Sequence, residues 1–180
     1  MTTTIDFEFR NQILETHNAK TLSYCYQCGT CSGGCPVAQV TDGVYNPRRL
    51  IIESLLGLKE KLITQKVPDV WQCATCQKCV QQCPQDVELT EVFMLLRNLS
   101  TDRGLAPKGY YAQAKTIMTD GKAIPLQAAI ARRRTQLGIP EAVQPNVDEV
   151  QAIMKETGFD QRIEKAPAGD AAPAKEESAE

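Results

Sequence analysis

Two cysteine-rich runs constrain this sequence more than any other feature. The first, CYQCGTCSGGCP, spans residues 25–36, and the second, CATCQKCVQQCP, spans residues 73–84. Both follow the pattern C-x2-C-x2-C-x3-C-P, and each cysteine of the first run has a counterpart 48 residues later. All eight cysteines of the chain lie in these runs. A fold for this chain must therefore gather sulfur at two points of an internal repeat.

The clustering favours metal ligands over disulfides, because disulfide scaffolds scatter cysteines along the chain to tie distant segments. The start, MTTTIDFEFRNQILE, has acids where a secretory signal peptide would have a basic and then an apolar run. No apolar stretch approaches the ~18 residues needed to cross a bilayer. We therefore expect a soluble, cytoplasmic protein without direct membrane insertion.

The C-x2-C-x2-C-x3-C-P run is typical of [4Fe-4S] binding, where the fourth cysteine ligates the other cluster of a pair. We therefore expect two [4Fe-4S] clusters with all eight cysteines as ligands. One cluster would be held by Cys25, Cys28, Cys31 and Cys83, and the other by Cys73, Cys76, Cys79 and Cys35. Neither set is complete until both halves of the chain meet, which couples cluster insertion to folding. Local ligation by each fourth cysteine is the alternative.

Zinc is the competing metal. Structural zinc sites made of four cysteines usually take two separated C-x2-C pairs. Four cysteines within eleven residues, twice, fit that spacing poorly and leave the third cysteine of each run without a role. A zinc scaffold is therefore the less favoured alternative.

The rest of the sequence offers no substrate chemistry. It contains no G-x-G-x-x-G after a strand, no P-loop and no Cys-Cys pair, and its single histidine, His17, is expected at the surface. The net charge of -2 lacks the basic excess of a nucleic-acid binder. We expect one-electron transfer, with no catalytic residue and no nucleic-acid partner.

Helical periodicity dominates outside the cysteine runs. One helix is predicted from Asn46-Pro47, a cap followed by a first-turn proline, to about Lys61. Another is predicted over Thr90–Arg103, with Gly104 as a C-cap. Three glycine-terminated helical segments follow within residues 106–164, and no stretch alternates with the period of a strand. The fold class is predicted to be all-α.

The composition divides the chain into four parts. We expect an N-terminal segment over 1–20, the two-cluster domain over 21–104 and a helical docking extension over 105–164. Residues 165–180, KAPAGDAAPAKEESAE, lack large apolar side chains and cannot bury enough surface to offset the entropy of ordering. This tail is expected to be disordered.

The residues between the cysteines of the first run resemble those of a known protein family. CYQCGTCSGGCPV and CATCQKCVQQCP, separated by a predicted helix that begins NPRRLI, resemble the C subunit of soluble heterodisulfide reductases from methanogenic archaea. The likeness covers roughly residues 20 to 160. The cysteine motif alone is shared with helical ferredoxin-like domains of succinate dehydrogenase and of anaerobic glycerol-phosphate and lactate oxidation proteins. Gln27, Gly29 and the Gly33-Gly34 pair make the heterodisulfide reductase group the best match.

The resemblance implies an all-helical two-cluster ferredoxin-like domain and a non-catalytic electron-transfer subunit of an oxidoreductase complex. In that family, a flavin-containing and iron-sulfur-containing partner bifurcates electrons, and the C subunit passes those of one branch to a second partner. The second partner, with Cys-Cys-Gly clusters, reduces the coenzyme M–coenzyme B heterodisulfide of methanogenesis. A hydrogenase or a formate dehydrogenase would be the upstream donor.

Two alternatives stay open. The chain could be a relay in a related complex that oxidises sulfur compounds, lactate or glycerol phosphate, or it could be a free ferredoxin carrier. A free carrier is disfavoured because the segment 105–164 looks structured and would have no purpose in it. Free ferredoxins are also often strongly acidic, whereas the body of this chain outside the acidic tail is neutral.

Overall fold

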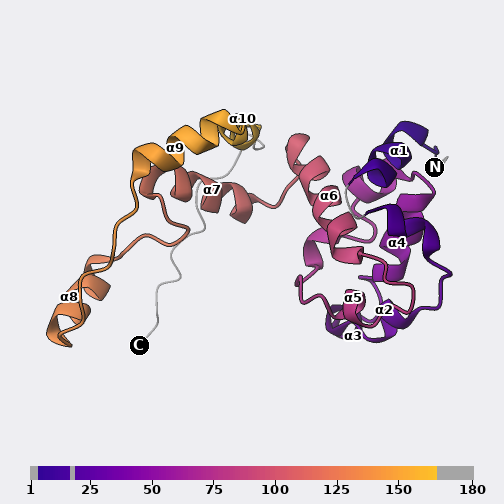
Figure 1. The fold of residues 1–180 in the computed structure, drawn as a ribbon, viewed down its shortest axis with the longest axis horizontal. Helices are drawn as coiled ribbons and strands as arrows, with labels where there is room; N and C mark the ends of the chain where they lie inside the picture. The colour runs from indigo at the N-terminus through magenta and orange to yellow at the C-terminus, as the bar shows by residue number, and fades with distance from the viewer. Residues whose placement is uncertain (1–3, 17–18, 166–180) are drawn as a thin grey trace. The chain divides into compact units, whose positions relative to one another are not determined.

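The computed structural model describes residues 4–16 and 19–165 (Figure 1). Within these ranges every regular element is helical, which confirms the predicted all-α class. The 3-10 elements are η1 (Ala19–Tyr24) and η3 (Val70–Gln72), and η2 (Glu60–Thr64) is a π-helical turn. The α-helices are α1 (Phe7–Glu15), α2 (Thr30–Gly33), α3 (Pro36–Val40), α4 (Pro47–Leu55), α5 (Lys78–Gln81), α6 (Leu89–Asp102), α7 (Lys108–Asp120), α8 (Ala128–Gln136), α9 (Val147–Glu156) and α10 (Phe159–Glu164).

Two predictions concern residues outside the described part of the chain. The surface position expected for His17 lies there, and so does the disorder expected after Lys165. Lys165 itself follows α10 as its C-cap. The chain divides into two compact units, with the division between Leu105 and Ala106.

The first unit packs its helices around one apolar core. The α1, α4 and α6 helices each bury a stripe spaced three or four residues apart, as expected for amphipathic helices. Residues of these stripes that are at most 1% exposed are Phe9, Ile13, Leu50, Ile51, Val92, Phe93 and Leu96. Figure 1 shows the short helices α2, α3 and α5, which flank the cysteines, gathered at one end of this unit. The core thus anchors the segments that carry sulfur.

The helix predicted from Asn46 to Lys61 is wrong in its end point. Its start is confirmed, because the Asn46 side chain accepts a hydrogen bond from Arg49 N. The helix ends at Leu55 because Gly57 takes a left-handed φ of 72°, which breaks the α-helical ladder. Gly57 O then accepts a hydrogen bond from Asp6 N at 2.9 Å, so the N-terminal segment binds where this helix ends.

The α6 helix agrees with its prediction to within one residue at each end, and Gly104 follows it with a left-handed φ of 71°. The α1 helix was not predicted. Its cap is Asp6, whose carboxylate accepts from Phe9 N at 2.8 Å. Phe9 and Ile13, four residues apart, supply its buried side.

The second unit contains α7, α8, α9 and α10. The α9 helix packs against α7 and α10, and Gln151 Nε2 donates to Met118 O at 2.9 Å across α9 and α7. The α8 helix has no buried residue in the described chain. None of the described helices combines the length and the apolar character that a bilayer span requires.

Candidate metal centre

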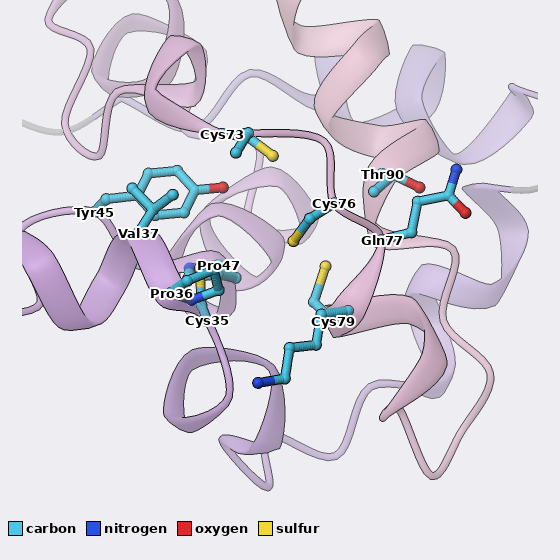
Figure 2. A pocket seen from close by; sticks show the side chains of 12 residues that line it. Cys35, Pro36, Val37, Tyr45, Pro47, Cys73, Cys76, Gln77, Cys79 and Thr90 are labelled. Carbon is cyan, nitrogen blue, oxygen red and sulfur yellow. The ribbon is translucent and has the colours of Figure 1, made fainter.

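Four cysteines line one recess at the sulfur-rich end of the first unit. These are Cys35, Cys73, Cys76 and Cys79, and this site is called the Cys73 recess below. Figure 2 shows the sulfur atoms of Cys73, Cys76 and Cys79 turned toward a shared space, with the Tyr45 ring at its side. The space among the lining residues measures about 320 Å³, including open solvent.

The other four cysteines line a second recess. These are Cys25, Cys28, Cys31 and Cys83, and this site is called the Cys25 recess. Its space measures about 330 Å³ on the same basis. Each recess therefore takes three cysteines from one run and the fourth from the other. This is the grouping that cross-ligation requires.

Left-handed residues shape both cysteine loops. Gln27 and Gly29, on either side of Cys28, have φ of 64° and 85°. Thr75 and Gln77, at the equivalent positions of the second run, have φ of 54° and 60°. Left-handed backbone is costly for residues other than glycine, so its repetition at two pairs of equivalent positions, three of them not glycine, marks a loop shape that both sites need. The sharp turns curl each run so that its first three cysteines face one recess.

The short helices α2 and α5 bring the two runs together. They contact one another, and each carries the third cysteine of its run. Gly34 and Gln82, 48 residues apart, meet at this contact, where a Cβ on Gly34 would lie 2.1 Å from Gln82 Oε1. The fourth cysteine then precedes a proline, and Pro36 starts α3. Cys35 and Cys83 each line the recess that holds the first three cysteines of the other run.

Hydrogen bonds already point at several sulfur atoms. Gln27 Nε2 donates to Cys25 Sγ at 3.1 Å. The backbone N–H groups of Thr75 and Val87 donate to Cys73 Sγ at 3.4 Å and to Cys83 Sγ at 3.3 Å. Such donors stabilise negative charge on sulfur, which is what a thiolate ligand carries.

The thiols differ in the ease with which they lose their protons. The Thr30 hydroxyl, 3.3 Å from Cys28 Sγ, lowers the pKa of Cys28. Burial raises the pKa of Cys79 to about 12, with a further contribution from the Cys73 sulfur. Burial likewise raises the pKa of Cys31. Cationic iron would compensate the buried thiolates, so the donor chemistry of both recesses fits a bound metal group.

The sulfur arrangement also bears on the kind of metal group. Within residues 4–16 and 19–165, no three His, Cys, Asp or Glu side chains converge closely enough to hold one metal ion. The four thiols of each recess instead surround a space. Four thiolates around one space are the ligand set that a [4Fe-4S] cluster takes.

Arg97 of α6 supports the Cys73 loop, and sequence reasoning missed it. The residue is only 9% exposed, and its guanidinium donates to the backbone carbonyls of Val70 and Cys73 and to Thr75 Oγ1. It also lies over the Trp71 ring, 5.4 Å from the centroid. Arginine on a helix is normally solvent-exposed, so the sequence carried no sign of this role.

A helical unit with two cysteine-lined recesses that exchange their fourth cysteines defines a two-cluster ferredoxin-type protein. In agreement, the sequence profile of the 4Fe-4S dicluster domain matches residues 21–87. The chain therefore has the cofactor set expected from its motifs, two [4Fe-4S] clusters.

Comparison with known proteins identifies the family. The chain is 31% identical over 172 residues to the iron-sulfur C subunit 2 of the CoB–CoM heterodisulfide reductase of Methanocaldococcus jannaschii, covering 88% of this chain and 90% of that protein. It is 34% identical over 169 residues to the C subunit of the H2:CoB–CoM heterodisulfide, ferredoxin reductase of Methanothermobacter marburgensis, covering 88% and 86%. It is 33% identical over 168 residues to the C2 subunit of the H2/formate:CoB–CoM heterodisulfide, ferredoxin reductase of Methanococcus maripaludis, covering 86% and 89%. The chain belongs to the family of heterodisulfide reductase C subunits.

Proposed function

We propose that this chain is the electron relay of a cytoplasmic heterodisulfide reductase complex. It would take single electrons from the flavin-containing, bifurcating partner and deliver them to the Cys-Cys-Gly partner, which reduces the coenzyme M–coenzyme B heterodisulfide in methanogenesis. Bound [4Fe-4S] clusters supply one-electron redox chemistry. The observation that carries the proposal is the pair of recesses with exchanged cysteines in a chain of this family.

The protein contributes proximity between two redox sites. The α2 and α5 helices touch, and the charge of Cys31, from the Cys25 recess, helps to raise the pKa of Cys79, from the Cys73 recess. Sites close enough for their sulfur atoms to interact electrostatically form two steps of one path. One site would face each of the two larger partners.

All eight cysteines are proposed as ligands with cross-ligation. The sets are Cys25, Cys28, Cys31 and Cys83 for one cluster, and Cys73, Cys76, Cys79 and Cys35 for the other. Electron paramagnetic resonance of single serine variants tests this. Cys35→Ser and Cys73→Ser should perturb the same cluster spectrum, and Cys83→Ser and Cys25→Ser the other. Local ligation would instead pair Cys35→Ser with Cys25→Ser.

The domain arrangement proposed is an N-terminal segment at 1–20, a cluster domain at 21–104, a docking extension at 105–164 and a tail at 165–180. The extension exposes large apolar side chains on and after α8, including Ile130 at 47% and Leu137 at 57%. We propose that these side chains contact a partner protein. Ile130→Asp/Leu137→Asp should weaken retention of the partner proteins without loss of iron, and Gln136→Asp on the same helix is the control.

Anaerobic isolation of the native protein, with identification of its partners and analysis of flavin, iron and zinc, tests the assignment. We expect a flavoprotein and a Cys-Cys-Gly protein to accompany the chain, with about eight irons attributed to it. A hydrogenase or formate dehydrogenase is the expected donor, since two relatives carry H2 or formate in their names. A brown, monomeric chain isolated alone would favour a diffusible carrier. Partners that oxidise sulfur compounds, lactate or glycerol phosphate would move the relay to a different complex.

A further inference from the structure

Tyr45 lies against the Cys73 recess although no cysteine motif includes it. It precedes α4 and is 1% exposed, and its N–H is held by Thr41 Oγ1 at 3.2 Å. It lines the recess together with Cys35, Cys73 and Cys79. Figure 2 shows its hydroxyl directed toward the space that the cysteines share.

The Tyr45 hydroxyl is a buried, unsatisfied polar group among the described residues. It is fully buried and has no hydrogen-bond partner in the described part of the chain. Buried hydroxyls in folded proteins nearly always have a partner, and tyrosine is seldom buried without one. A tyrosine hydroxyl carries its proton at neutral pH and can then donate a hydrogen bond. A buried donor without a partner, facing a site built for a metal group, points to an acceptor on that group.

The repeat places a different residue in the other recess. Tyr45 stands two residues before the first residue of α4, and Val87 stands two residues before the first residue of α6. Val87 lines the Cys25 recess beside Cys83 as Tyr45 lines the Cys73 recess beside Cys35. Val87 is also buried but carries no side-chain donor. The hydroxyl therefore distinguishes two otherwise similar sites.

We propose that Tyr45 is a potential-setting residue that donates a hydrogen bond from its hydroxyl to a sulfur atom of the cluster held in the Cys73 recess, a sulfide or the Cys73 thiolate. The inference rests on the ligand assignment of the proposed function. A donor to sulfur favours the reduced, more negative state and so raises the reduction potential. Tyr45 would make the Cys73-recess cluster a better electron acceptor than it would be without the hydroxyl.

Tyr45→Phe tests this in the full-length, cluster-loaded chain by an anaerobic redox titration followed by electron paramagnetic resonance. The Cys73→Ser variant identifies which spectrum belongs to this recess. We expect that spectrum to titrate at lower potential, so that less than half of the cluster is reduced at the wild-type midpoint. The other spectrum should not move. Tyr24→Phe, which removes a hydroxyl from a side chain 63% exposed, is the matched control and should move neither.

Replacing Tyr45 by 3-fluorotyrosine provides an independent measurement that keeps the ring and the hydroxyl. Fluorine makes the phenol a stronger donor, so the same spectrum should titrate at higher potential. Unchanged midpoints in both variants, with full iron content, would overturn the proposal and leave Tyr45 a packing residue. If Tyr45→Phe loses iron, the fluorotyrosine variant alone decides. A failed ligand assignment would be recognised separately, because Cys35→Ser and Cys73→Ser would then perturb different spectra.

Discussion

Replacing Arg97 with methionine should destabilise the Cys73 loop far more than its place on a helix suggests. Methionine retains much of the aliphatic volume but none of the donors. Cys73 O would lose its only donor among the described residues, which costs about 1–3 kcal/mol. Val70 O would lose a charge-assisted bond worth about 1.5 kcal/mol but keep Cys73 N at 3.2 Å. The contact with Trp71 adds about 0.5–1 kcal/mol.

The total is about 3–5.5 kcal/mol, because the exposed Thr75 hydroxyl can return to water and adds little. At roughly 4–8 °C per kcal/mol for a unit of this size, the apparent Tm should fall by at least about 12 °C. Anaerobic differential scanning calorimetry measures the shift, and iron analysis should show loss of the cluster bound by Cys73 first. Arg103→Met, at the exposed end of the same helix, should change stability by no more than about 0.5 kcal/mol. Full iron content and a wild-type Tm in Arg97→Met would refute the reasoning.

Three further predictions concern backbone geometry and metal. Gly57→Ala should lower the free energy of unfolding, measured by urea denaturation, by about 2–3 kcal/mol. The left-handed φ is costly for alanine, and the new Cβ would lie 2.5 Å from Asp6 O. The control, Gly43→Ala, has a similar φ but open space around it and should cost only about 1 kcal/mol. Gln77→Gly should stabilise the chain by about 1 kcal/mol in the same assay by relieving a left-handed residue, and a loss of stability would contradict this. Anaerobic chelation of iron should expose the segment 73–84 to proteolysis, since each site joins both cysteine runs. A cleavage pattern equal to that of the cluster-loaded protein would count against the coupling of cluster binding to folding.

The parts of the fold that the sequence predicted are those governed by local rules. The α6 helix has a continuous apolar stripe and a terminal glycine, and it was placed to within one residue. The Asn46 cap was placed because a capping side chain acts within its own turn. The cross-ligation that the motif spacing predicts stays a prediction, and the grouping of three cysteines of one run with the fourth of the other in each recess supports it.

The errors and omissions depend on contacts between distant segments. The helix from Asn46 stops early because Gly57 takes a left-handed φ, and the contact of Gly57 with Asp6, more than fifty residues before it in the chain, could not be found from periodicity. The burial of Arg97 follows from loop carbonyls that only the folded chain brings near. The Tyr45 position could have been noticed only by superposing the two repeats on their helices, which start at different distances from the cysteines.

The exchange of fourth cysteines has a consequence for how such a protein could have arisen. A single repeat, with one run and one helix, would direct its fourth cysteine away from its own three. Such a half-length chain could complete a site only with the fourth cysteine of a second copy, so its smallest working form would be a symmetric dimer with two shared sites. Fusion of the two copies would turn that dimer into one chain and free each site to change independently. The tyrosine beside one recess and the valine beside the other show a difference that an identical pair could not have had.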